Sequence, residues 1–305
     1  MLGSLAIVLP VFGLIGVGYL ARQTGLVTDR AGDGLSEFVF ALAVPCLIFR
    51  TLVRAEIPEV QPWGYWISYF AGVAVVWGLA MWAARRFFAV GGTAAVVAGF
   101  SAGQANTVLV GIPMILKAYG DEGAVPLFLL IAVHLPVTMT LATVLAEGRQ
   151  ASPLAILRRL ATHPIIVAIL AGSACHPLAG HLPEPLWQVL DPIGNAAVPC
   201  SVVGMGIALR RYGLEAGWKL PAIIAALKLV LHPLVVFGLA TLVFEMPRAW
   251  AGVAVLFAAC PSGINAYLFA ERYGEGVAVA SSAVALSTAL ALATILVWLR
   301  VLGVG

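Results

Sequence analysis

The sequence predicts an all-α protein that crosses a lipid bilayer ten times. Its 305 residues are 62% hydrophobic and only 10% charged, and the mean hydropathy is +1.02. A soluble domain carries roughly a quarter charged residues. The apolar residues form runs of about 20, the length of helix that crosses the hydrocarbon core, and short loops between the runs hold most of the charge. A soluble fold is therefore excluded.

The first apolar run begins at once, without a basic region or a small-residue cleavage site, so we interpret it as a span and not as a signal peptide. In two of the ten spans, the fourth and the ninth, helix breakers stand beside polar residues. The predicted spans are residues 3–21, 31–53, 63–87, 93–118, 123–146, 153–175, 185–209, 218–244, 249–271 and 276–301.

Charge in the loops predicts the orientation. With the N-terminus outside, the cytoplasmic loops hold eleven Lys and Arg residues and the outer loops hold five. Cytoplasmic loops of membrane proteins carry the excess of basic residues, so both termini are expected outside. The net charge is only +3, in short clusters, and the four cysteines lack metal-binding spacing. We therefore expect no nucleic-acid partner, no metal site and no cofactor.

The two halves of the chain match at a fixed offset of 154 residues. The segment Ala43–Cys46 (AVPC) recurs at Ala197–Cys200, and Tyr119–Asp121 (YGD) recurs as Tyr273–Glu275 (YGE). Chance explains one such match in an Ala- and Val-rich sequence, but not several in register. Three single-residue pairs share the offset: Pro10 with Pro164, Gly18 with Gly172, and Glu37 with Asp191.

The repeat divides the chain into residues 1–147 and 148–305, with five predicted spans in each half. Because five is odd, the second half must be inserted upside down relative to the first. Such a 5+5 inverted repeat is typical of secondary transporters, since two similar halves of opposite topology give two states of similar energy. A receptor, a structural scaffold or an intramembrane enzyme has no such need. The G-x-S-x-G match at residues 99–103 lies inside a span, without the strand a nucleophile elbow requires, so we expect no enzyme.

Helix breakers and polar side chains coincide in spans four and nine. Proline removes a backbone hydrogen bond, while glycine and asparagine tolerate the unwound backbone that results. Such backbone occurs at membrane depth where it lines a cavity or is buried in protein, and its freed N–H groups suit an anion. The alternative is a simple proline kink with small residues for packing. The candidate break residues are Gly111, Pro113, Pro261 and Gly263, and the polar candidates beside them are Gln104, Asn106, Thr107, Ser262 and Asn265.

Five stretches, taken in order and spacing, resemble a known family. With them the whole chain resembles a short bacterial member of the auxin efflux carrier family, relatives of the plant PIN carriers, in the bile acid/sodium symporter-like superfamily. The long cytoplasmic loop of the plant members is absent. The stretches are Phe38–Leu52, Asn106–Gly120, His163–Gly172, Lys228–Pro233 and Pro261–Gly274.

The resemblance implies an elevator-type carrier in the inner membrane of a bacterium. Spans one, two, six and seven would form a scaffold that also makes a homodimer. Spans three to five and eight to ten would form the moving core, with the broken helices four and nine crossing at its centre. By the same resemblance, Asn106 and Asn265 would bind the substrate.

Ionisable residues inside spans are functional candidates by default. Lys228, near the middle of span eight, is predicted to hold a substrate carboxylate or to replace a coupling cation; its alternative is a structural bond to backbone carbonyls. His232 lies one turn later, and Glu37 and Asp191 are repeat mates that could carry protons. For these three, and for His134 in span five, the alternatives are packing or interface roles.

These observations predict a carrier for a small organic anion, such as a mono- or dicarboxylate or an auxin-like aromatic acid. Apart from Glu37 and Asp191 the spans hold almost no acidic residue, which argues against a cationic substrate. The alternative is a sodium-coupled symporter of the bile-acid type, because oxygen atoms of Gln104, Asn106, Thr107, Ser262 and Asn265 are possible sodium ligands. Coupling to H+ or Na+ is left open by the sequence.

Overall fold

The computed structural model describes residues 2–55, 63–148, 154, 158, 161–212 and 217–304, and over these residues the chain is helical, with no strand. Eight helices in this part of the chain are long and apolar enough to cross a membrane, and Gly92–Gly103 and Arg248–Ala259 are shorter apolar helices. The prediction of an all-α membrane protein is confirmed. The helices are α1 (Leu2–Gln23), α2 (Asp29–Phe38), η1 (Val39–Ala43), α3 (Val44–Arg54), α4 (Trp63–Phe88), α5 (Gly92–Gly103), η2 (Thr107–Gly111), α6 (Ile112–Glu147), α8 (Pro164–Cys175), η4 (His176–His181), α9 (Glu184–Leu209), α10 (Lys219–Ala226), η5 (Leu227–Leu231), α11 (His232–Phe237), η6 (Gly238–Val243), α12 (Arg248–Ala259), α13 (Ile264–Tyr273) and α14 (Val277–Val301).

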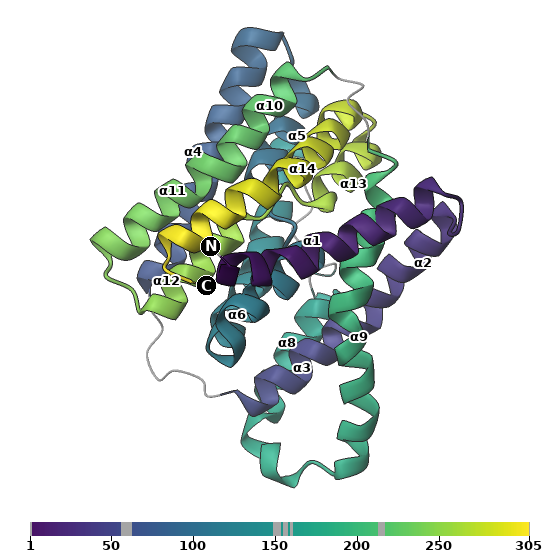
Figure 1. The fold of residues 1–305 in the computed structure, drawn as a ribbon. Helices are drawn as coiled ribbons and strands as arrows, with labels where there is room; N and C mark the ends of the chain where they lie inside the picture. The colour runs from purple at the N-terminus through teal and green to yellow at the C-terminus, as the bar shows by residue number, and fades with distance from the viewer. Residues whose placement is uncertain are drawn as a thin grey trace.

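The helices pack as two groups (Figure 1). The small helix group contains α1, α2, α3, α8 and α9, which contact one another closely; the large helix group contains α4, α5, α6 and α10 to α14. Fewer contacts join the groups, chiefly those of α1 with α14 and α6, and of η2 with α9. Both ends of the described chain lie at this junction, where Ser4 Oγ donates to Val304 O at 3.2 Å.

Glycines bring α1 and α9 into backbone contact. A methyl group at Gly206 would overlap the carbonyl oxygen of Ile15 and lie 2.8 Å from Tyr19 N, and one at Gly18 would meet the backbone of Val203. Small residues allow this close approach between membrane helices. The neighbouring Gly204 is different, because a methyl group there would meet only ordinary contacts at 3.6 Å. The small helix group is therefore tightly joined at Gly206.

The two predicted broken spans are interrupted. In the fourth, α5 ends at Gly103 and helix resumes at Thr107; in the ninth, α12 ends at Ala259 and α13 begins at Ile264. The first interruption comes before Gly111 and Pro113, which lie in the π-helical turn η2 and in the first turn of α6. The chain then turns at Gly120 (φ 56°), so α6 contains both the end of the fourth predicted span and the fifth.

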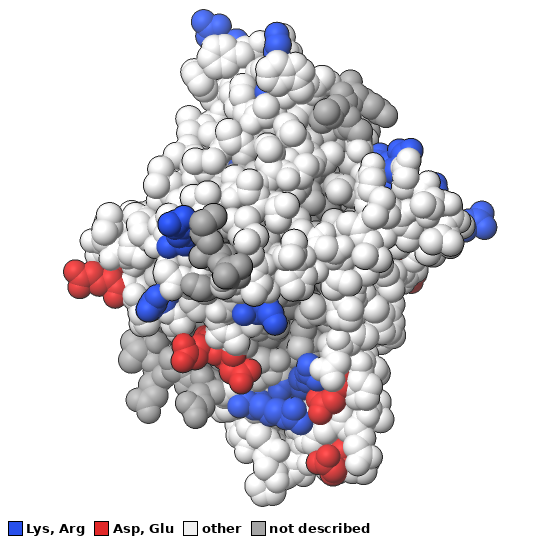
Figure 2. All heavy atoms as spheres, in the orientation of Figure 1, with Lys and Arg blue, Asp and Glu red and all other residues white. Residues whose placement is uncertain are grey.

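Charge is distributed unevenly over the surface (Figure 2). On the face shown, the upper and right-hand ends carry Lys and Arg, the left-hand side and the lower part carry both signs, and the broad area between these groups is almost free of charge. Such a surface suits a protein that lies in a bilayer. Two of the basic residues counted for the orientation, Arg149 and Arg159, and most of the start of predicted span six lie outside the described residues.

Candidate functional site

The two helix breaks lie side by side and share hydrogen bonds. Asn106 N–H donates to Pro261 O at 2.8 Å, and Gly263 N–H donates to Gln104 O at 2.9 Å, around an antiparallel bridge between Ala105 and Ser262. A buried backbone group without a partner is costly, above all in a membrane. Each break therefore supplies hydrogen-bonding partners for the other.

Side chains from neighbouring helices satisfy two further N–H groups of the breaks. His134 Nε2 on α6 accepts from Ala105 N–H at 3.3 Å, and Ser287 Oγ on α14 accepts from Ser262 N–H at 3.0 Å. Because Nε2 accepts, a neutral His134 carries its proton on Nδ1, which lies 3.0 Å from Tyr69 Oη. This geometry supports the packing alternative for His134, since both ring nitrogens are engaged in holding the first break.

Most polar candidates at the breaks are buried. Gln104, Asn106, Thr107 and Ser262 are each at most 6% exposed, whereas Asn265, in the first turn of α13, is half-buried. Thr138 Oγ lies 2.7 Å from Gln104 Oε1 and fixes that side chain to α6. The breaks thus bring five of the six predicted substrate-binding residues into one region.

Two oxygen atoms near the second break are left without protein partners. Ser262 Oγ and Thr288 Oγ are buried and make no hydrogen bond within the described part of the chain. Asn106 uses its side-chain N–H only towards a sulfur atom, Met205 Sδ on α9, at 3.3 Å. The region therefore holds polar atoms whose hydrogen-bonding capacity is free for a ligand.

Lys228, the sixth predicted binding residue, caps the end of α12. Its side chain is fully buried, and Nζ donates to Ala258 O at 2.6 Å and lies 3.2 Å from His232 Nδ1. Ala258 is the next-to-last residue of α12, where unpaired carbonyls carry partial negative charge. No carboxylate forms an ion pair with Lys228 in the described structure. The Lys228 side chain thus holds the helix end at the second break, without a carboxylate partner among the described residues.

Glu37 and Asp191 lie elsewhere, in the small helix group. Asp191 forms ion pairs with Arg50 at 3.2 Å and Arg54 at 3.6 Å. Arg54 also lies over the ring of Trp187, 4.1 Å from its centroid. Glu37 is exposed on α2. The structure therefore supports the interface alternative for Asp191 and brings neither carboxylate to the breaks.

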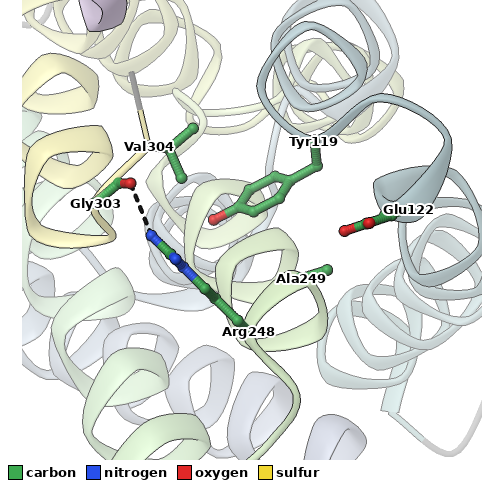
Figure 3. Close-up of a pocket in the computed structure, with 6 residues that line it drawn as sticks. All are labelled: Tyr119, Glu122, Arg248, Ala249, Gly303 and Val304. Atoms are coloured by element: carbon green, nitrogen blue, oxygen red, sulfur yellow. Dashed lines mark hydrogen bonds between the residues drawn. The ribbon is translucent and has the colours of Figure 1, made fainter.

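A separate hollow of about 350 Å³ lies near the chain terminus (Figure 3). It is lined by Tyr119, Glu122, Arg248, Ala249, Gly303 and Val304. Arg248 Nη2 donates to Gly303 O at 2.8 Å, and the Tyr119 hydroxyl points toward this pair without a partner. Glu122 places a carboxylate in the lining besides the guanidinium of Arg248, and no residue of the breaks lines this hollow. We therefore do not place the anion site there.

Sequence reasoning missed the residues that support the breaks. Tyr69, Thr138, Ser287 and Met205 lie on four different helices, and none belongs to a motif. The available signal was weak: polar side chains inside apolar spans, which commonly have a buried partner. In the part of the chain that the structure describes, no group of three or more His, Cys, Asp or Glu side chains is placed to hold a metal.

Comparison with known proteins identifies the family. A family model described as "Membrane transport protein" matches residues 4–299, nearly the whole chain. The chain belongs to this family of membrane transport proteins. The resemblance to auxin efflux carriers is thereby confirmed, and "Auxin efflux carrier component 8" of Arabidopsis thaliana is 21% identical over 95% of this chain and 94% of its own length.

Two further relatives of this membrane transport protein are prokaryotic. A protein of Rhizobium meliloti (strain 1021) named "Putative malonate transporter" is 31% identical over 95% of this chain and 92% of that protein. An "Uncharacterized transporter" of Methanothermobacter thermautotrophicus is 25% identical over 99% of both chains. These names describe transporters, not enzymes, and the chain is accordingly a membrane transporter of this family.

Proposed function

We propose that this membrane transport protein is a secondary carrier for a small organic anion, with a short dicarboxylate such as malonate as the first candidate. The observation that carries the proposal is the pair of mutually hydrogen-bonded breaks beside the buried, carboxylate-free ammonium of Lys228. The name of the Rhizobium relative supports malonate as the first acid to test.

Each residue at the breaks has a distinct proposed role. The amides of Asn106 and Asn265 donate hydrogen bonds to a carboxylate, and the free hydroxyl of Ser262 supplies a third donor. Lys228, bound to the carbonyl of Ala258 near the end of α12, contributes a positive charge that attracts the anion. Neutral amides suit a carrier because they bind the anion without the strong counter-charge that would retain it.

The two helix groups support an elevator mechanism. We propose that the chain is built from two inverted repeats, residues 1–147 and 148–305. The small helix group is the scaffold, and the large helix group is the moving core, with broken spans four and nine crossing at its centre. The limited contacts between the groups suit sliding of one against the other. The scaffold is also the proposed surface for a homodimer.

The proposed orientation places both termini outside the inner membrane. Cysteines introduced at positions 25 and 215, in a chain without its native cysteines, should react only with reagents that reach the cytoplasm; position 215 lies outside the described residues. Reaction of either cysteine with an impermeant reagent from outside would contradict the proposed orientation.

Sodium coupling is the second candidate function, favoured by the unpartnered oxygen atoms of Ser262 and Thr288 near the second break. Sodium is a hard cation that binds such oxygens. In this case the carrier would be a sodium-coupled organic-anion symporter, and uptake would require an inward sodium gradient.

Uptake into proteoliposomes tests both candidates. Radiolabelled malonate should accumulate saturably, and unlabelled short carboxylates should compete, with sodium and pH gradients imposed in turn. Asn106→Ala should reduce uptake strongly, while Glu122→Gln in the separate hollow serves as the matched control. If the folded parent carries no carboxylate of the panel, or carries an organic cation instead, the proposal fails.

A further inference from the structure

Resting on the proposed function, we infer that the sulfur of Met205 occupies, in the empty carrier, the position that a substrate carboxylate oxygen takes beside Asn106. Met205 is then the residue of the scaffold that the substrate displaces and that limits the size of the acid.

The inference begins with one contact between the helix groups. Asn106 Nδ2 donates to Met205 Sδ at 3.3 Å; Asn106 is 3% exposed and Met205 is 0% exposed. Asn106 lies between the first break and η2, in the large helix group, while Met205 lies on α9 in the small one. The donor of the proposed substrate-binding amide therefore points at the scaffold.

Both backbones at this contact are firmly held. Asn106 N–H is bound to Pro261 O at 2.8 Å. Met205 precedes Gly206, whose close approach to Ile15 and Tyr19 fixes α9 against α1. Only the methionine side chain, with three rotatable bonds, is free to withdraw. A ligand can therefore replace the sulfur without moving either helix.

The chemistry of the contact favours replacement. A thioether is a weak hydrogen-bond acceptor, whereas a carboxylate forms hydrogen bonds that are shorter and roughly twice as strong as those between neutral groups. In a buried site the amide gains by exchanging sulfur for a charged oxygen. The weak bond keeps the amide in place when the site is empty and adds only a small barrier to substrate entry.

The position of Met205 also bears on specificity. Its side chain fills the space between the amide and α9, so a carboxylate that binds Asn106 must fit in the volume that the methionine vacates. Shortening residue 205 should enlarge this space and admit longer dicarboxylic acids, while the hydrogen bonds from the first break remain.

The test uses methyl NMR and calorimetry on the full carrier in nanodiscs, with malonate as the probe. The methyl signal of Met205, assigned with Met205→Leu, should shift as malonate saturates the site. The signal of Met81, which packs beside Gly99 within the large helix group, should not. Met205→Leu keeps the side-chain volume and removes the sulfur acceptor. The empty carrier then lacks one hydrogen bond that malonate would otherwise have to displace, so the variant should bind malonate about two- to tenfold more tightly.

A double-mutant cycle and a size series complete the test. The gain from Met205→Leu should vanish when Asn106 is alanine, and Met205→Ala should improve binding of glutarate relative to malonate, with Met81→Leu as the matched control. The inference is wrong if the Met205 signal does not shift at saturating malonate, or if Met205→Ala has the same acid selectivity as the parent. In either case, measured malonate binding would still support the proposed carrier function. If the folded parent binds no acid, the proposed function itself is wrong.

Discussion

Replacing Lys228 with methionine removes the only Lys, Arg, Asp or Glu side chain that is buried among the described residues, at nearly constant volume. Its Nζ lies 2.6 Å from Ala258 O, and Pro261 O lies 2.8 Å from Asn106 N. The three peptide steps from Ala258 to Pro261 span at most about 10 Å between Cα atoms, so the charge lies on the order of 15 Å from the proposed anion site.

This distance sets the size of the expected effect. At 10 to 15 Å and an effective dielectric constant of about 20, one positive charge attracts one negative charge by about 1.1–1.7 kcal/mol, or roughly tenfold in affinity. A dianion should therefore lose about twice the free energy that a monoanion loses. The melting temperature should also fall, because the Ala258 carbonyl loses its partner at a cost of about 1–3 kcal/mol, partly offset since an ammonium group is no longer buried.

Calorimetric titration of the purified carrier with malonate and with acetate measures both effects. Lys117→Met is the matched control, because Lys117 is exposed on α6 and its charge is screened by solvent and salt. If folded Lys228→Met binds both acids as the parent does, or loses equal affinity for the two, the charge does not act on the substrate. Lys228 would then serve only to cap α12, and the Lys228→Met variant would differ from the parent only in its lower melting temperature.

Three further predictions concern other residues. Asn106→Ala or Asn265→Ala should weaken carboxylate binding about ten- to a hundredfold, and Asn→Asp should weaken it further by like-charge repulsion; calorimetry showing parental affinity in an Asp variant would contradict this placement. Gly206→Ala should destabilise the carrier by about 1–3 kcal/mol through overpacking, while thermal melting should show Gly204→Ala unchanged. Asp191→Asn should cost under about 1 kcal/mol of stability, as part-exposed ion pairs do, and proteoliposome uptake should respond to a pH gradient as the parent's does; a weaker response than the parent's would assign Asp191 to proton coupling.

The sequence predicted the helical class and the two interrupted spans, because apolar runs and helix breakers are local signals. In the fourth span the interruption lies at Gln104 to Asn106, among the predicted polar residues, and Gly111 and Pro113 come after it. Pro113 lies in a helical stretch that runs without interruption from the π-helical turn η2 into α6, so it does not break the span. The burial of Lys228 followed from its depth in span eight, but its partner, the carbonyl of Ala258, has no side-chain signature. Likewise, nothing in the sequence marks Met205, whose role depends on how α9 meets η2.

The bridge between Ala105 and Ser262 also bears on how the chain is made. The two residues are separated by about half the chain, so during synthesis the fourth span enters the membrane long before its partner exists. Until the ninth span arrives, N–H and C=O groups at Gln104 and Asn106 lack the partners they have in the finished protein. A nascent chain that stalls before that point would present bare peptide groups at bilayer depth, a feature that membrane chaperones and quality-control proteases are suited to recognise. Completion of the second half is thus the step at which the backbone groups of the first break gain their partners.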